Sequence, residues 1–165
     1  MIYNQHKIPK NQWRYGFRSS AATGCGWIAT YNALKLLGYQ ASPEGLIRYY
    51  SRQLPLIHGN MGTTLFGPVV YFLRWGFPVK MAWMRKNFDE LAKNSHACIL
   101  FYRWRRGFRF GAHFVALEHT QQGFVGYNTY RTSEGPDHYR ESLRLFLEKR
   151  NYYGAVLIGI RDKRS

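Results

Sequence analysis

Apolar residues recur at helical spacing in the first half of the chain. Ile28, Tyr31 and Leu34 stand three residues apart, and Gly38 follows as a helix stop. Before them, residues 1–24 form a polar and aromatic arm without a helical period, which we expect to be extended. The same pattern of cap residues, apolar spacing and glycine stops predicts three helices, over about 25–37, 43–52 and 63–75, with a glycine loop at 58–62.

From residue 77 onward the pattern changes from helical to extended. Short β-compatible runs are separated by two helical segments. We expect strands over about 78–84, 96–104, 112–119, 124–130 and 153–160, and helices over 87–93 and 139–150. This order predicts a single α+β domain over residues 1–165, in which a helical half, 25–76, packs against an antiparallel sheet half, 77–165.

Composition supports a folded and strongly basic protein. Of 165 residues, 45% are hydrophobic and 18% aromatic, which excludes a disordered chain. The net charge of +15 makes acidic peptides, nucleic acid or anionic lipid plausible partners. Cys25 and Cys98 cannot form a disulfide framework, so a reducing compartment fits. The amino end lacks the apolar run of a signal peptide and no later run could span a membrane, so we expect a cytoplasmic protein.

Cys25 is the candidate nucleophile. A loop of small residues delivers it to the first turn of the first predicted helix, and Gly24 and Gly26 leave little steric cover on its sulfur. A helix N-terminus carries partial positive charge and unpaired N–H groups, which favour thiolate and can bind an oxyanion. The alternative is a small buried cysteine at a helix start.

A cysteine nucleophile needs a base, and His113 is the strongest candidate. It begins a predicted strand between small residues, whereas His96 and His119 stand at strand ends. Asn128, on the next predicted strand, can fix the imidazole tautomer. If an even-numbered loop joins the two strands, His113 and Asn128 share one face; an odd-numbered loop reverses that parity.

Together these segments resemble the papain-like cysteine peptidases, and among them the compact bacterial domains related to the bacteriocin-processing, double-glycine leader peptidases. Segment 24–29 (GCGWIA) is similar to the nucleophile helix, segment 111–117 (GAHFVAL) to the base strand, and residues 127–128 (YN) to the orienting strand. The order of Cys, His and Asn agrees with the family. The resemblance implies a papain-like fold and a catalytic triad of Cys25, His113 and Asn128 that hydrolyses, or transfers through a thioester, an amide bond of a peptide or protein.

The resemblance also implies an oxyanion-binding glutamine before the nucleophile. The papain pattern places it six residues upstream of the cysteine, where this chain has Ser19. Gln12 is the nearest glutamine, and Ser19 or Ser20 are possible substitutes. Loss of one oxyanion donor costs about a hundredfold to a thousandfold in rate. The serine at this position therefore argues against full proteolytic activity but does not exclude activity.

Two further features have structural and functional interpretations. Cys98 lies in an apolar run and is expected to be buried and inert. Residues 103–110 interleave arginines with aromatic residues, which suits a solvated strand edge, a substrate contact or a nucleic-acid surface. No metal or cofactor motif is present, so neither is expected. A silent peptide-binding relative and a nucleic-acid-binding module remain the alternative functions.

Overall fold

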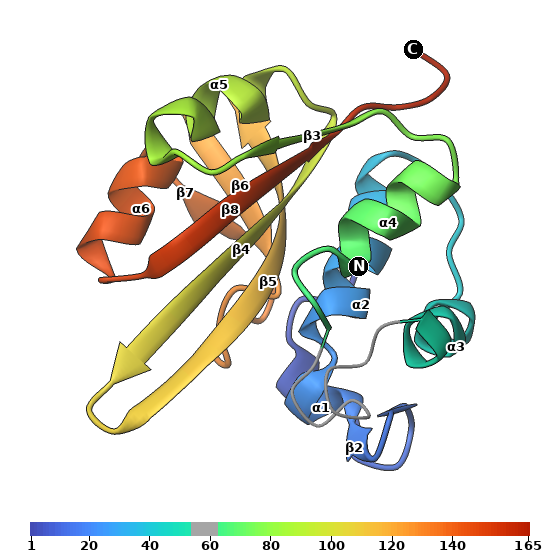
Figure 1. Cartoon of the computed structure of the whole chain (residues 1–165). Coiled ribbons are helices and arrows are strands. Elements are labelled where there is room, and N and C mark those ends of the chain that lie inside the picture. Colours follow the sequence, from blue (N-terminus) through green and yellow to red (C-terminus); the bar gives the residue numbers. More distant parts are fainter. Residues whose placement is uncertain (54–62) are drawn as a thin grey trace.

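The computed structural model describes residues 1–53 and 63–165 and shows a mixed α+β architecture. An antiparallel sheet stands between two groups of helices, one on each face (Figure 1). The glycine loop predicted at 58–62 lies outside the described residues. Among the described residues, no helix has the length and apolar character needed to cross a membrane.

The main sheet has six strands in the order β3-β8-β4-β5-β6-β7, and every neighbouring pair is antiparallel. A small hairpin near the amino end stands apart from this sheet. The strands of the main sheet are β3 (Val79–Ala82), β4 (Ala97–Arg106), β5 (Arg109–Thr120), β6 (Gly123–Tyr127), β7 (Asp137–Tyr139) and β8 (Tyr153–Ile160), and those of the hairpin are β1 (Arg14–Tyr15) and β2 (Arg18–Ser19).

Helix α2 is the centre of the helical half, because it is buried on almost every side and packs on β5 and β4. Its residue Trp27 is fully buried, and the indole N–H donates to Ser20 Oγ at 3.1 Å. The helices are α1 (Ser20–Thr23), α2 (Cys25–Leu36), α3 (Pro43–Gln53), α4 (Gly67–Arg74), α5 (Phe88–Lys93) and α6 (Leu143–Lys149), with 3₁₀ turns η1 (Gln5–Lys7) and η2 (Arg85–Asn87).

Side chains of the central strands alternate between two cores. On β5, Phe114 and Ala116 belong to the core under α2, whereas Val115 and Leu117 belong to the core under α5 and α6. Both faces of the strand are therefore buried, which explains why its sequence is a continuous apolar run and not a strict alternation. The base strand predicted from the sequence lies between these two layers.

The structure confirms most predicted elements and corrects several boundaries. The arm is not simply extended, because it contains η1, β1, β2 and α1. Helix α4 starts at Gly67 with Pro68 in its first turn, and not at residue 63 as predicted; Thr63 is buried and contacts Tyr15. Ser142 caps α6 by accepting from Leu145 N at 3.1 Å, and the start predicted at 139 instead ends strand β7, which the sequence analysis missed.

Candidate functional site

Cys25 is the first residue of α2, as predicted. Helix α1 ends at Thr23, and the Gly24 carbonyl accepts from Ile28 N at 3.0 Å, so a new helix begins at the cysteine. The half-buried sulfur takes hydrogen bonds from the backbone N–H groups of Phe114, Gly26 and Cys25 itself. Strand β5 therefore meets the thiol at the residue that follows His113.

The electrostatic state of the thiol differs from the sequence-based prediction. Burial raises the pKa of the Cys25 thiol, and the hydrogen bonds from Phe114, Gly26 and Cys25 N–H groups lower it by less. The resting group is accordingly a thiol at neutral pH, whereas the helix N-terminus alone favours thiolate. A base is needed to remove its proton before it can attack a carbonyl.

Gly26 is required by packing and not by access to the sulfur. A Cβ at this position would collide with Oγ1 of Thr63 and come within 2.5 Å of Thr63 Cβ. Thr63 is held in place because its hydroxyl shares a 3.1 Å hydrogen bond with the Tyr15 hydroxyl, and both side chains are buried. The first turn of α2 is thus in direct contact with Thr63, and only glycine fits at position 26.

His113 is half-buried, and its Nε2 lies 2.7 Å from the backbone carbonyl oxygen of Asn128. A carbonyl can only accept, so Nε2 carries the proton and Nδ1 keeps its lone pair in the neutral ring. Burial lowers the pKa of His113 to about 4; the Asn128 carbonyl opposes this, and the nearby His6 adds to it. The ring is therefore neutral at pH 7, which is the form that can accept a proton.

The surroundings of His113 are aromatic on the side away from α2. His113 stands opposite Tyr102 in the β4–β5 register, and the two rings meet edge to face with centroids 5.9 Å apart. The next residue, Phe114, packs under α2, the helix that begins at Cys25. His113 thus lies at the margin of the core under α5 and α6. The Cys25 thiol approaches the same strand from the core under α2.

Asn128 lies next to His113, as predicted, but contacts it through a different atom. Thr120 pairs with Gly123, so the loop has two residues, but β6 ends at Tyr127 and Asn128 follows the strand. Asn128 has a left-handed φ of 65°, which turns its carbonyl toward His113. Its side chain points to Gln5, accepting from Gln5 N at 2.8 Å and donating Nδ2–H to Gln5 Oε1 at 3.0 Å. The orienting group is the carbonyl, and not the predicted side-chain amide.

Gln5 is the site residue that the sequence analysis missed. It is buried, and besides its two bonds to Asn128 its Nε2 donates to Ala21 O at 3.2 Å, beside the turn that precedes Cys25. The amino-terminal segment is fixed on both sides, because Asn32 exchanges two 2.8 Å hydrogen bonds with the backbone of Ile2. A glutamine in the arm was a visible signal, but no spacing rule links it to Asn128.

The other oxyanion candidates lie elsewhere. Gln12 is exposed, and its N–H donates to Pro9 O at 3.0 Å in a surface turn. Ser19 is paired with Arg14 in the β1–β2 hairpin and makes no side-chain cap bond to α1. Ser20 is buried and its hydroxyl accepts from Trp27. Gln5, and not Gln12, is the glutamine that bonds α1, the short helix just before Cys25.

The remaining titratable candidates have structural roles. Cys98 is buried, and its surroundings raise the pKa of its thiol to about 12, as expected for an inert cysteine. His96 accepts from Asp162 N at 3.1 Å near the carboxyl end of the chain, and His119 pairs with Phe124 at the far end of β5. Within the described residues, no three His, Cys, Asp or Glu side chains come together to hold a metal ion.

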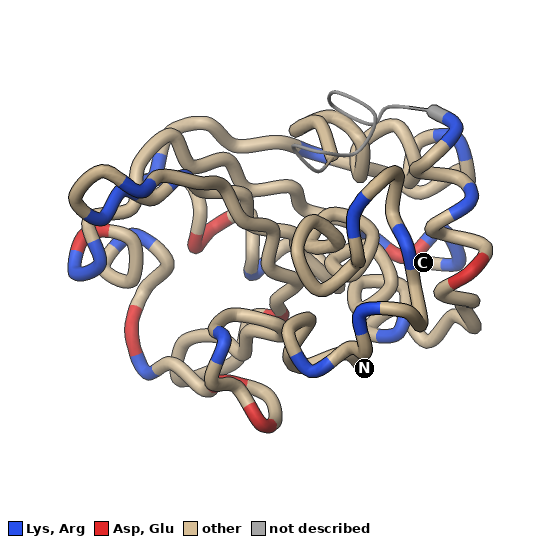
Figure 2. Tube along the Cα trace, turned by 90° about the horizontal axis from the view of Figure 1, so that it is seen from below, with Lys and Arg blue, Asp and Glu red and all other residues tan. Residues whose placement is uncertain are grey.

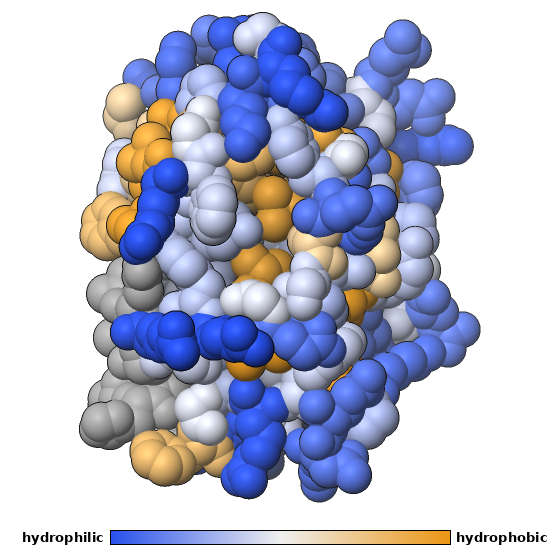
Figure 3. Space-filling model, turned by 90° about the vertical axis from the view of Figure 1, so that its right-hand side faces the viewer, coloured by the Kyte–Doolittle hydropathy of each residue, from blue (hydrophilic) through white to orange (hydrophobic). Residues whose placement is uncertain are grey.

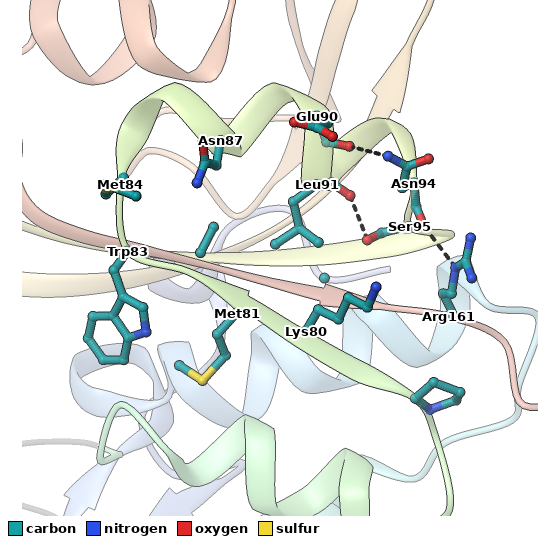
Figure 4. Close-up of a pocket in the computed structure, with 13 residues that line it drawn as sticks. Lys80, Met81, Trp83, Met84, Asn87, Glu90, Leu91, Asn94, Ser95 and Arg161 are labelled. Carbon is teal, nitrogen blue, oxygen red and sulfur yellow. Dashed lines mark hydrogen bonds between the residues drawn. The ribbon is translucent and has the colours of Figure 1, made fainter.

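Two surface hollows lie away from Cys25 and His113. One, of about 750 Å³, lies between β3 and α5; its polar groups serve the fold, since Ser95 Oγ donates to Leu91 O and Arg161 Nε to Asn94 O (Figure 4). The other, of about 420 Å³, lies between α3 and α4 on the side of the molecule shown in Figure 3, where basic side chains surround apolar ones. Neither contains a predicted site residue.

Comparison of the chain with protein-family models and with curated proteins finds no match. The geometry of Cys25, His113, Asn128 and Gln5 is therefore the basis for any function.

Proposed function

We propose that this chain is a papain-like cysteine hydrolase that cleaves an amide bond of a peptide or protein through a Cys25 thioester. The observation that supports it most is the meeting of α2 and β5. The Cys25 sulfur takes the N–H of Phe114, one residue from His113, while His113 Nε2–H is held by the Asn128 carbonyl. Helix, base strand and orienting strand follow the order of the papain-like family.

The proposed reaction uses the neutral thiol and the neutral imidazole. His113 Nδ1 takes the thiol proton as Sγ attacks the acyl carbon, and the imidazolium then gives that proton to the leaving amine as the C–N bond breaks. Water next attacks the thioester and loses a proton to His113, which returns it to sulfur as the acid leaves. The Asn128 carbonyl accepts from Nε2–H throughout and stabilises the imidazolium.

Oxyanion binding falls to donors at the start of α2 and to Gln5. The Gln5 amide nitrogen has two N–H groups and donates one of them to Ala21 O. The second N–H is the proposed side-chain donor to the developing oxyanion, with the backbone N–H groups at the start of α2 beside it. Gln5 replaces the predicted Gln12 and Ser19 in this role.

The proposal is tested by labelling the folded protein with iodoacetamide from pH 3 to 10 and following each cysteine by mass spectrometry. The labelling rate of Cys25 is expected to rise through about pH 4, because His113 loses its proton there and can then accept the thiol proton. It then reaches a plateau, and rises again at the raised thiol pKa. His113→Ala is expected to remove the first rise and keep the second.

Cys98 is the internal control for that experiment, because it is buried and its thiol pKa is raised to about 12. It is expected to stay unlabelled until the protein unfolds. A Cys25 that reacts only on unfolding, or a profile that His113→Ala leaves unchanged, contradicts the hydrolase.

A second function, peptide binding without cleavage, is favoured by one specific observation. Burial raises the pKa of the Cys25 thiol, so the nucleophile is not ionised at rest. A chain that binds peptides in the same place and leaves them intact would show the binding but none of the His113-dependent labelling. The labelling experiment therefore separates the two functions.

A further inference from the structure

The hairpin formed by β4 and β5 extends beyond the rest of the sheet (Figure 1). Its outer part, residues 103–110, is here named the arginine hairpin: it holds four arginines and no acidic residue. The side chain of Phe108 is 100% exposed and that of Phe110 is 75% exposed. Lys and Arg are spread over the whole molecule, and acidic residues are few (Figure 2). The arginine hairpin is thus an exposed, purely cationic and aromatic projection.

The arrangement of these arginines works against the stability of the hairpin. Arg106 and Arg109 stand directly opposite each other beside the tight turn at Gly107, which has a φ of 58°. Like charges in opposite positions repel, and within the described residues none of the four arginines forms an ion pair with Asp or Glu. A negatively charged ligand would relieve that repulsion.

One backbone edge of the same hairpin is open. Strand β4 pairs with residues 109–117 of β5, but β6 pairs only with residues 116–120. Within the described structure, residues 109–115 therefore have no strand on their second side. The N–H of Phe114 points to this side, because it meets the Cys25 sulfur. By alternation, Phe110 and Ala112 present their N–H and C=O groups along the same edge.

The arginine beside this edge is Arg109, which stands on β5 itself with Arg106 opposite it on β4. Arg103 lies against Gly154 of β8, and Arg105 Nε donates to Gly107 O at 3.2 Å, so these two arginines stand on the far side of β5. A strand laid along the open edge would thus run from the arginines to the Cys25 sulfur. Strand edges of this kind bind extended peptides through main-chain hydrogen bonds, and the side chains beside them give specificity.

We propose that the open edge of β5 from 109 to 113 binds the substrate as an added strand, and that the arginine hairpin selects an acidic peptide. This inference rests on the proposed hydrolase, because it names the substrate class of the same site. A peptide fits better than a nucleic acid, since the exposed donors and acceptors are those of a β-ladder and they lead to the thiol. Carboxylates of the peptide would pair with Arg109 and Arg106, and its main chain with Phe110 and Ala112.

The experiment measures binding to the full chain carrying Cys25→Ser, so that no peptide is cleaved. Two fluorescent peptides of equal length are compared by anisotropy at about 0.1 M salt, one with alternating Glu and one with Lys in its place. The Glu peptide is expected to bind, and the Lys peptide is not. N-methylation of alternate amides in the Glu peptide is expected to weaken binding by about tenfold or more, because it removes the ladder donors.

Matched arginine variants test the charge. The double variant Arg106→Gln and Arg109→Gln is expected to weaken binding of the Glu peptide by roughly tenfold or more. The control, Arg48→Gln and Arg52→Gln on the exposed side of α3, changes net charge equally and is expected to alter affinity by less than about twofold. Equal losses in the two variants would show nonspecific attraction and overturn the proposal.

The remaining outcomes separate this inference from the hydrolase. A reactive Cys25 in a chain that does not bind the Glu peptide overturns the acidic-strand site and leaves the hydrolase. An inert Cys25 in a chain that still binds the Glu peptide through the hairpin overturns the hydrolase and leaves the strand site. Tight binding of single-stranded oligonucleotide that the hairpin variant abolishes, with no change in peptide binding, assigns the arginines to nucleic acid and overturns the proposal.

Discussion

Replacing Cys25 with alanine is expected to lower the rate of peptide hydrolysis by at least about 10⁴-fold, because removing the nucleophile of a triad leaves only binding and oxyanion stabilisation. Substrate affinity is expected to stay close to that of the unaltered chain. The measurement is kcat/KM on a fluorogenic acidic peptide, together with the dissociation constant of an uncleaved analogue. A loss confined to kcat places Cys25 in the chemical step.

Cys98→Ala is the matched control, since it removes the other sulfur of the chain. Cys98 is buried in the core under α5 and α6, so its loss creates a small cavity and no change in the reaction. Hydrolysis is expected to remain within about twofold of the unaltered protein. Equal activity of Cys25→Ala and Cys98→Ala would rule out a Cys25 thioester.

Replacing Asn128 is expected to cost stability far more than activity. Asn128→Gly keeps the left-handed backbone but leaves the buried N–H and Oε1 of Gln5 without their partners, at about 1–3 kcal/mol each. Asn128→Ala is expected to lose about 1 kcal/mol more stability than Asn128→Gly, because the Cβ of alanine is strained at a φ of 65°. The free energy of unfolding from urea titration measures both losses.

Asn151 is the control for the backbone part of this effect. It is exposed and has a left-handed φ of 52°. Asn151→Gly is expected to be nearly neutral, and Asn151→Ala to cost about 1 kcal/mol. If Asn128→Gly proves as harmless as Asn151→Gly, the bonds to Gln5 do not hold the arm.

Activity of the same variants decides which part of Asn128 orients His113. The carbonyl remains in Asn128→Gly and Gln5 Nε2 keeps its bond to Ala21 O, so hydrolysis by the folded fraction is expected to fall by less than about tenfold. An orienting side chain would instead cost on the order of 10²-fold or more, as in other triads. That larger loss would favour the side-chain role implied by the family resemblance.

The elements that the sequence predicted are those whose signal is local. Helix α2 has regular apolar spacing and ends before Gly38, which adopts the expected left-handed φ of 77°. Strand β8 is a continuous apolar run. Strand β7 was missed because Asp137–Tyr139 is short and polar; its pairing with β6 depends on Tyr139 stacking on Phe124, with ring centroids 4.6 Å apart.

The candidate site was predictable to the level of strands and not of atoms. The sequence left the parity of the loop after Thr120 open, and the structure gives it two residues. Which atom of Asn128 contacts His113 depends on one dihedral angle, and asparagine adopts both signs of φ. The thiol pKa depends on burial by residues far along the chain, so the helix N-terminus alone gave the wrong ionisation state.

The contacts of residues 4 and 5 have a consequence for the order of folding. Asn4 Nδ2 donates to Arg131 O at 2.7 Å and to Ser133 O at 3.1 Å, across 127 and 129 positions of sequence, and Gln5 bonds to Asn128. Because closing so long a loop carries an entropic cost, these contacts are expected to form late in folding, after the loop that follows β6 is in place. The bonds of Gln5 to Asn128 and Ala21 then form in the same late step.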